Sequence, residues 1–229
     1  TRSASVSGLG DVYKRQVFPL LNALEKTIGK SEYLDFMKSF KYPLAGEFSF
    51  RRNILPELRI SSDWGIEIGI LSEMQRNFSP QNICQVDLAD TYDHKHQDLS
   101  TNDENKGLSR MSIDIIKTFI KKLATQGHSF SREQLRSLKA TYYRSALDLI
   151  DAYRGDAEMN GLKFDSHSEE KAVELFSKNI IKAGEDFYLN PMDAPFIPTW
   201  SRVKSAIPDF LIRLETVSYT HLRAHETEA

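Results

Sequence analysis

Four segments in the second half of the chain carry apolar residues at the spacing of an amphipathic helix, and this pattern limits that half to a helical fold. The segments cover residues 108–125, 131–153, 168–187 and 200–214. Apolar residues three and four positions apart share one face of a helix, and that face must pack against a core. We therefore expect residues 107–217 to form a mostly helical unit.

Start signals support two of these helices. Ser131 and Gln134 have the spacing of a capping box, in which each side chain binds the backbone N–H of the other residue. Ser168 is followed by Glu169 and Glu170, and acidic residues favour the first turn of a helix. These features predict helices capped by Ser131 and Ser168.

The first half of the chain mixes helical and alternating patterns. Residues 17–28 have one apolar face at helical spacing and are followed by Gly29, a residue that suits a helix C-cap. A second helix is expected over residues 64–76, where Ser62 or Asp63 would provide the N-cap.

Two stretches of this half alternate as β-strands do. Residues 42–52 place Phe48 and Phe50 on one face, and residues 83–88 alternate in part. Because two or three strands do not form a stable sheet alone, these stretches would belong to a larger sheet. The sequence thus predicts the α/β class, with few strands followed by a helical extension.

The two ends of the chain differ from the rest. Residues 1–16 and 218–229 show no useful periodicity, and their strings GLGDVYKRQ and SYTHLRAHETEA are typical of translated sequencing-adapter sequence. Non-native ends carry no information about the native fold. We expect residues 17–217 to be native and to be an internal piece of a longer protein.

The composition permits a folded core and gives no sign of a nucleic-acid or membrane partner. The net charge of -2 includes no basic excess, and no apolar run approaches the roughly 18–20 residues that cross a bilayer. A single cysteine, Cys84, excludes an internal disulfide framework and a cysteine-rich zinc site. Its apolar neighbours predict a buried, inert thiol. This cysteine usage fits a cytoplasmic protein.

A polar loop over residues 89–106 holds the densest group of chemically versatile side chains. In an extended segment His94 and His96 would point to the same side. Imidazole nitrogens are common ligands of divalent metals, and nearby carboxylates complete such sites. Lys95 adds a positive charge that suits a phosphate. A metal or phosphate site is one interpretation, and a solvated polar loop is the other.

Two further candidate sites lie in the first half. Trp64 offers a flat apolar face for a sugar ring or a base, and Glu67 could accept hydrogen bonds from hydroxyl groups. Alternatively, Glu67 is only a capping partner of Asp63. Gly46 in the turn over residues 43–47 would let a ligand approach the backbone closely, or the turn simply leads into a strand.

Four motifs together carry a family resemblance. PLLNAL, PLAGEFSFRR, DWGIEIGILSE and ICQVDLADTYDHKHQ, in this order and spacing, resemble the glucosyl-3-phosphoglycerate synthases, which are retaining glycosyltransferases of the GT-A type. The resemblance implies that residues 17–106 are part of a GT-A catalytic domain and that residues 107–217 are its helical C-terminal extension. It also implies transfer of glucose from a nucleotide-diphosphate donor to the 2-hydroxyl of 3-phosphoglycerate, with retention, toward glucosylglycerate.

The resemblance also implies roles for individual residues. His94 would hold a divalent metal, Mg²⁺ or Mn²⁺, and Glu67 would bind the hydroxyls of the donor glucose and act as the catalytic residue. The residues expected to bind substrate are Leu44, Ala45, Gly46, Glu47, Asp63, Trp64, Lys95 and His96.

Parts of the family pattern have no counterpart in this sequence. The family's DxD motif lies upstream, and the string VYKRQ stands where its acceptor loop belongs. We therefore expect the chain alone to be inactive. The resemblance also implies that the full-length parent is a homodimer. Two alternatives stay open: a related GT-A hexosyltransferase that uses mannose or glycerate, and a helical interaction module that is no enzyme.

Overall fold

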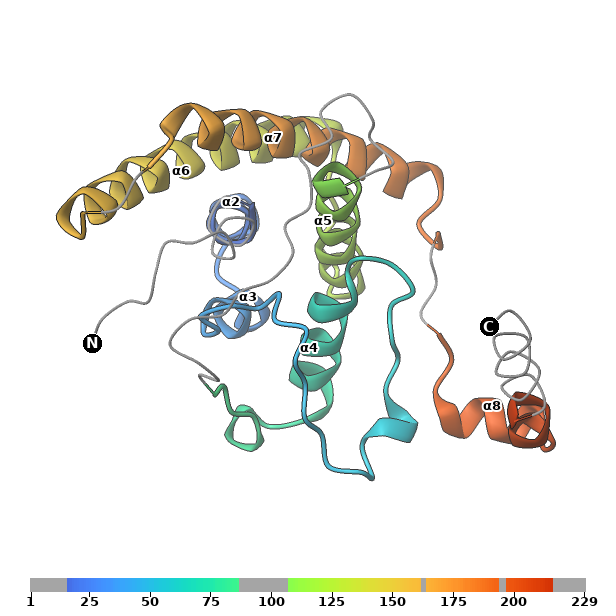
Figure 1. Ribbon diagram of the computed structural model, residues 1–229. Helices are drawn as coiled ribbons and strands as arrows, with labels where there is room; N and C mark the ends of the chain where they lie inside the picture. Colours follow the sequence, from blue (N-terminus) through green and yellow to red (C-terminus); the bar gives the residue numbers. More distant parts are fainter. Residues whose placement is uncertain (1–15, 87–106, 162–163, 194–196, 216–229) are drawn as a thin grey trace, which may run out of the picture.

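The computed structural model describes residues 16–86, 107–161, 164–193 and 197–215, and the order of its helices is shown in Figure 1. The helices are α2 (Phe18–Ile28), α3 (Glu32–Lys38), α4 (Ile66–Asn77), α5 (Gly107–Thr125), α6 (Arg132–Met159), α7 (Ser166–Leu189) and α8 (Trp200–Ala206). Two short 3₁₀ helices, η2 (Leu55–Glu57) and η3 (Pro80–Asn82), lie in the connections.

The predicted α/β class with a partial GT-A sheet is wrong for the part of the chain that the structure describes. That part contains no β-strand, and its only bridge of the β type joins Ile60 to Ile197. Residues 42–52 and 83–86 are irregular, while residues 87 and 88 lie outside the described ranges. The strand predictions for these two stretches are therefore also wrong.

Side-chain alternation alone does not make a strand, because a strand needs a neighbour that exchanges backbone hydrogen bonds with it. Phe48 and Phe50 do lie on one side, with stacked rings 5.8 Å apart. However, a hydrogen bond between these regions uses a side chain: the backbone N–H of Lys41, just before the first stretch, donates to Oε1 of Gln85 at 2.7 Å. The alternating pattern thus predicted correctly that Phe48 and Phe50 share a face, but it wrongly predicted that the backbone pairs with a neighbouring strand.

The helix predictions fared better, since caps and periodicity are local properties. Gly29 has a φ of 86° and caps α2, as expected, and Ser131 forms its capping box with Gln134. Ser168, in contrast, is not a cap: its N–H donates to the side chain of Asp165, which is the N-cap of α7. The helix predicted over residues 200–214 is also interrupted, because α8 ends at Ala206 and helical structure resumes at residue 210.

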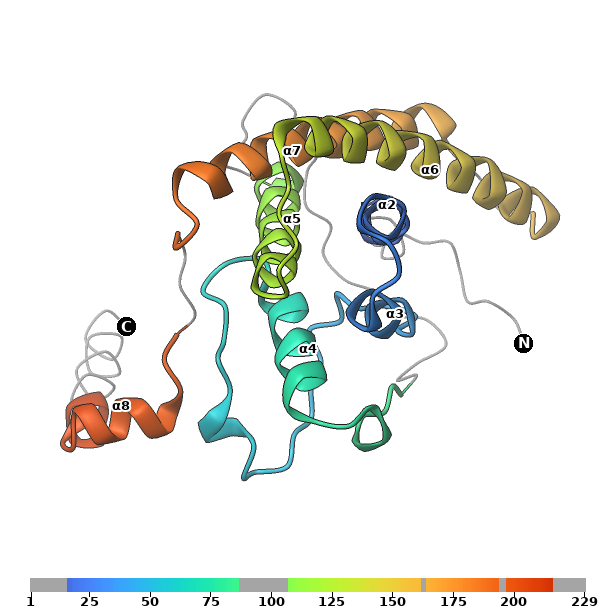
Figure 2. The same ribbon diagram turned by 180° about the vertical axis from the view of Figure 1, so that it is seen from behind.

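The main core lies between α2, α5, α6 and α7. The long helices α6 and α7 run side by side, with α2 beneath them and α5 crossing below, as Figures 1 and 2 show from opposite sides. Leu21, Phe119, Tyr142 and Phe176 are fully buried there. The core thus joins residues from both sides of residue 106, whereas the predicted division into domains at that residue stays a prediction.

Helix α4 packs on two sides. Ile68 and Leu71 belong to the main core, while Ile70 and Met74 form a smaller cluster with Leu58. Burying a side chain of this size stabilises the fold by about 1.5–3 kcal/mol, so α4 is firmly held. No helix among the described residues is long and apolar enough to cross a membrane.

Candidate functional site

The turn that opens α4 carries the first group of predicted site residues. Gly65 is the N-cap, and no side chain caps this helix. Oδ1 of Asp63 accepts the N–H of Gly65 at 3.0 Å, which closes the turn before the helix. The prediction that Ser62 or Asp63 is the N-cap is therefore wrong. Because the helix has no side-chain cap, Glu67 in its first turn is not committed to a capping box.

The side chain of Trp64 projects from this turn toward solvent. It is 44% exposed, although an indole of this size is usually well covered. A flat apolar face that stays accessible can stack on a sugar ring or a base. The structure thus leaves Trp64 available for the role that the sequence suggested.

The turn over residues 42–47 carries the second group. The N–H of Ala45 donates to the carbonyl of Tyr42 at 3.2 Å, and Pro43 is buried beneath it. Gly46 and Glu47 are exposed at the end of the turn. This local geometry places the end of the PLAGE motif, Gly46 and Glu47, at the surface.

The two groups meet although about 20 residues separate them in sequence. A Cβ atom built on Gly46 would lie 3.9 Å from Oε1 of Glu67, with no nearer atom outside the adjoining residues. Glu47 is also close enough to act on the charge of Glu67. The fold therefore assembles Gly46, Glu47 and Glu67 into one small acidic surface.

The electrostatics of this surface make Glu67 unusual. Burial raises the pKa of its carboxyl above the ordinary value of 4.5, and the negative charge of Glu47 raises it further. The backbone N–H of Glu67 itself opposes these effects. A carboxylate that is partly removed from water and lies near another negative charge interacts strongly with any donor or positive charge placed beside it.

A groove of about 900 Å³ runs alongside the PLAGE turn. It reaches Ala45, Gly46 and Glu47, whereas Glu67 and Trp64 lie outside its lining. Its walls are mostly apolar and come from the extended stretches and from α4: Phe48, Phe50, Leu71, Met74, Phe78 and Ile83. The sequence pattern predicted the shared face of Phe48 and Phe50, but as part of a sheet that the described residues do not form.

Cys84 lies at the same groove and is exposed. The prediction of a buried thiol is therefore wrong, because it depended on a strand that does not form. A second groove of about 810 Å³ lies by α4 and α5 and reaches Asp63, Lys121 and Lys122.

The predicted metal and phosphate ligands His94, Lys95 and His96 lie outside the described residues. Within the ranges that the structure describes, no group of three His, Cys, Asp or Glu residues could hold a metal ion. The metal site thus stays a prediction based on the family resemblance.

Comparisons with known proteins confirm that resemblance. A glucosyl-3-phosphoglycerate synthase of Persephonella marina is 39% identical over 196 residues, which cover 86% of this chain and 48% of that protein. One of Methanococcoides burtonii is 38% identical over 206 residues, which cover 90% of this chain and 50% of that protein. A third, of Petrotoga mobilis, is 34% identical over 85 residues.

The chain spans about half the length of the first two relatives. No protein-family model matches the sequence, and no solved structure matches it.

Proposed function

We propose that this chain, which is homologous to the glucosyl-3-phosphoglycerate synthases over about half of their length, provides the sugar-binding side of a glucosyltransferase. The reaction would move glucose from a nucleotide-diphosphate donor to 3-phosphoglycerate. The observation that carries the proposal is the approach of the PLAGE turn to the start of α4, where Gly46 and Glu67 adjoin. Both motifs contributed to the resemblance, and the fold brings them together.

Glu67 would bind the hydroxyl groups of the donor glucose. Its partly buried carboxylate gains more from a hydroxyl donor than a fully hydrated one does, because fewer water molecules must be displaced. The same negative charge would stabilise positive charge that develops on the sugar as its bond to the diphosphate breaks. Gly46, which has no side chain, leaves room for the sugar beside Oε1 of Glu67.

The neighbouring residues would orient the sugar. The exposed ring of Trp64 offers a stacking face at the edge of the site. The backbone of Leu44 and Ala45 would line the other side, and Asp63 would act by shaping the turn that carries Trp64.

A divalent metal, Mg²⁺ or Mn²⁺, would neutralise charge on the departing diphosphate. His94 is the proposed ligand, and Lys95 and His96 would contact phosphate or the acceptor. The cytoplasmic location and the homodimer expected from the sequence also stay predictions.

The test uses a full-length protein that carries residues 17–217 of this chain. Incubation with nucleotide-diphosphate glucose, 3-phosphoglycerate and Mg²⁺ should yield glucosyl-3-phosphoglycerate, which mass spectrometry detects and whose anomeric configuration NMR determines. The variant Glu67→Gln should lose most of this product. Exclusive transfer of mannose, or transfer to glycerate alone, would contradict the proposed substrates.

A matched control is Glu185→Gln, which removes a carboxylate of the same type from an exposed position on α7. It should retain activity. If Glu67→Gln and Glu185→Gln are equally active, Glu67 has no part in the reaction.

A further inference from the structure

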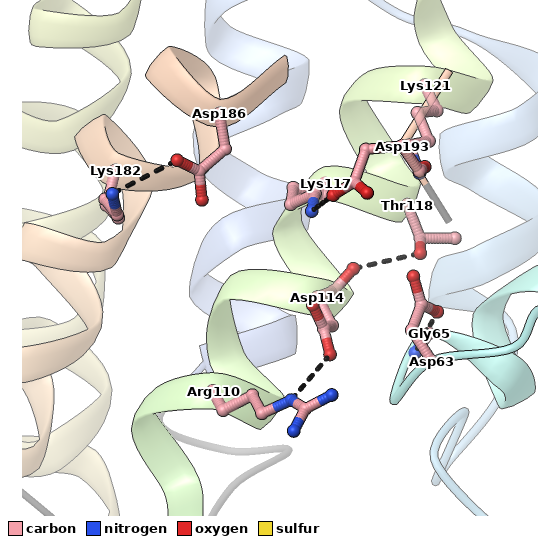
Figure 3. Close-up of polar contacts among 10 residues, drawn as sticks. All are labelled: Asp63, Gly65, Arg110, Asp114, Lys117, Thr118, Lys121, Lys182, Asp186 and Asp193. Carbon is pink, nitrogen blue, oxygen red and sulfur yellow. Dashed lines mark hydrogen bonds and ion pairs between the residues drawn. The ribbon is translucent and has the colours of Figure 1, made fainter. Parts of the chain in front are cut away.

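The turn over Asp63, Trp64 and Gly65 rests directly on α5, a helix from the other half of the chain. A Cβ atom built on Gly65 would lie 1.9 Å from Oγ1 of Thr118 and 2.9 Å from its Cβ. Both distances are shorter than any real Cβ contact, so the interface has room for a hydrogen atom only. Figure 3 shows Thr118 projecting from α5 toward this turn.

Thr118 is itself held in place. Its hydroxyl donates to the carbonyl oxygen of Asp114 at 2.9 Å, and the residue is buried. A buried β-branched side chain with a satisfied hydroxyl has little freedom about χ1. The surface against which Gly65 packs is therefore rigid.

Asp114, four residues before Thr118 on α5, lies close to the same turn. Burial and the charge of Asp63 raise the pKa of the Asp114 carboxyl, and the backbone N–H of Trp64, which faces this carboxyl, acts in the opposite direction. Oδ2 of Asp114 is buried and has no hydrogen-bond partner, and Nε of Arg110 lies 3.9 Å from it. The cost of burying this carboxylate is only partly compensated, which is unusual for a side chain with a purely structural role.

The same face of α5 also holds the segment that follows α7. Nζ of Lys117 pairs with Oδ2 of Asp193 at 2.8 Å, and Lys121 donates to the backbone oxygen of Asp193. Figure 3 shows these contacts beside the Asp63 turn. One helix face thus positions two irregular segments of the chain.

We propose that Asp114 and Thr118 are positioning residues for glucosyl transfer: by fixing the Trp64–Gly65 turn against α5, they place the ring of Trp64 and the carboxylate of Glu67. The inference rests on the proposed function and deepens it. Because α4 starts at Ile66, immediately after this turn, any shift of the turn moves Glu67. Misplacement by about 1 Å can cost roughly 100-fold in rate.

The first test compares two substitutions of Asp114 in the full-length protein. Asp114→Ala removes the carboxylate that faces the Trp64 N–H and should lower kcat about 10–100-fold, with a much smaller change in KM for the donor. Asp114→Asn keeps an acceptor oxygen and should recover most of the rate. Arg110→Ala is the matched control, since it removes the nearby cation and leaves the turn untouched.

The second test uses the steric contact. Gly65→Ala should displace the turn and lower kcat, because a methyl group does not fit against Thr118. Thr118→Gly removes both conflicting atoms, so the double variant Gly65→Ala/Thr118→Gly should be more active than Gly65→Ala alone. If Gly65→Ala does not fold, the Asp114 pair still decides the question.

The outcomes separate this inference from the proposed function. Suppose that the unsubstituted protein transfers glucose and that Glu67→Gln is inactive. If folded Asp114→Ala then keeps a kcat within twofold of that of the unsubstituted protein, the positioning role is wrong and the proposed function stands. If Asp114→Asn is as impaired as Asp114→Ala, an acceptor oxygen facing the Trp64 N–H is not what positions the turn. If the unsubstituted protein transfers no glucose, the proposed function is wrong, and the positioning role that rests on it is wrong as well.

Discussion

Oε1 of Glu67 lies 3.9 Å from the point where Gly46 would carry a Cβ atom. This contact joins the PLAGE turn to the first turn of α4, which are separate in sequence. A side chain at residue 46 would point into the space beside the one carboxylate for which the family resemblance implies a catalytic role. Substitution at residue 46 is therefore a direct test of the proposed sugar site.

Substitution of Gly46 should reduce glucosyl transfer in proportion to the size of the new side chain. At 3.9 Å an alanine makes an ordinary van der Waals contact, so Gly46→Ala should fold and keep substantial activity. Gly46→Leu would occupy the space proposed for the sugar and should lower kcat/KM for the donor about 10–100-fold. Steady-state kinetics of both variants in the full-length protein provide the measurement. Full activity of Gly46→Leu would place the sugar elsewhere.

Glu67 should make the stability of the chain depend on pH. Burial and Glu47 raise its pKa in the folded state above the ordinary value of 4.5. The folded state therefore binds the proton more tightly than the unfolded state, and stability falls as the pH rises from that ordinary value through the raised pKa. Glu67→Gln, which does not ionise, should be more stable than the unsubstituted chain at pH 7.

Urea denaturation at several pH values between 4 and 7 measures this effect. The advantage of Glu67→Gln should shrink toward pH 4, where the glutamate is protonated in both states. Glu185→Gln, on the exposed face of α7, controls for the loss of a charge. A stability difference between Glu67→Gln and the unsubstituted chain that is the same at every pH would show that the ionisation of Glu67 is not its cause.

The two glycines inside α6 and α7 should respond oppositely to alanine. A Cβ on Gly184 would lie 2.3 Å from Cδ1 of Leu135, a buried side chain of α6, so Gly184→Ala should cost about 1–3 kcal/mol. A Cβ on Gly155 would meet nothing within 4 Å. Since alanine favours the helix, Gly155→Ala should stabilise the chain by up to about 1 kcal/mol. Thermal or urea unfolding of both variants provides the measurement. Equal changes in stability for Gly184→Ala and Gly155→Ala would contradict the close approach of α6 and α7 at Gly184.

Removal of the His94 imidazole should weaken divalent-metal binding. We expect His94→Ala to raise the Kd for Mn²⁺ about tenfold or more, because one of few protein ligands is lost. Calorimetric or EPR titration of the full-length protein provides a readout that does not depend on activity. His128→Ala, which removes a histidine between α5 and α6, is the control. Equal affinities of the two variants would show that His94 is not a ligand.

The helices were largely predictable because their signals are local. The Ser131 capping box involves residues three positions apart, and Gly29 adopts its positive φ at the residue that follows the apolar face of α2. Such features depend on a few neighbouring side chains and on backbone geometry. The cap of α7 was missed by three residues because Asp165 competes successfully with Ser168 as an acceptor of backbone N–H groups.

The sequence indicated which residues belong to the candidate site but not how they are arranged in space. The motifs singled out Trp64, Glu67 and Gly46, whereas nothing in their spacing indicated that Glu67 adjoins Gly46. Asp114 and Thr118 were missed altogether, since they occupy ordinary positions in a long amphipathic helix. Only the folded chain shows the buried oxygen of Asp114 and the contact of Thr118 with Gly65.

The sequence by itself thus determined the helices, the faces that they bury and the family to which the chain is similar, because periodicity, caps and motifs are properties of short segments. The tertiary structure alone decided that the extended stretches form no strands and that Gly46 lies against Glu67. It also decided that α5 supports the Trp64 turn. Each of these outcomes depends on contacts between residues about 20 to 50 positions apart, where the packing of the whole core selects the partners.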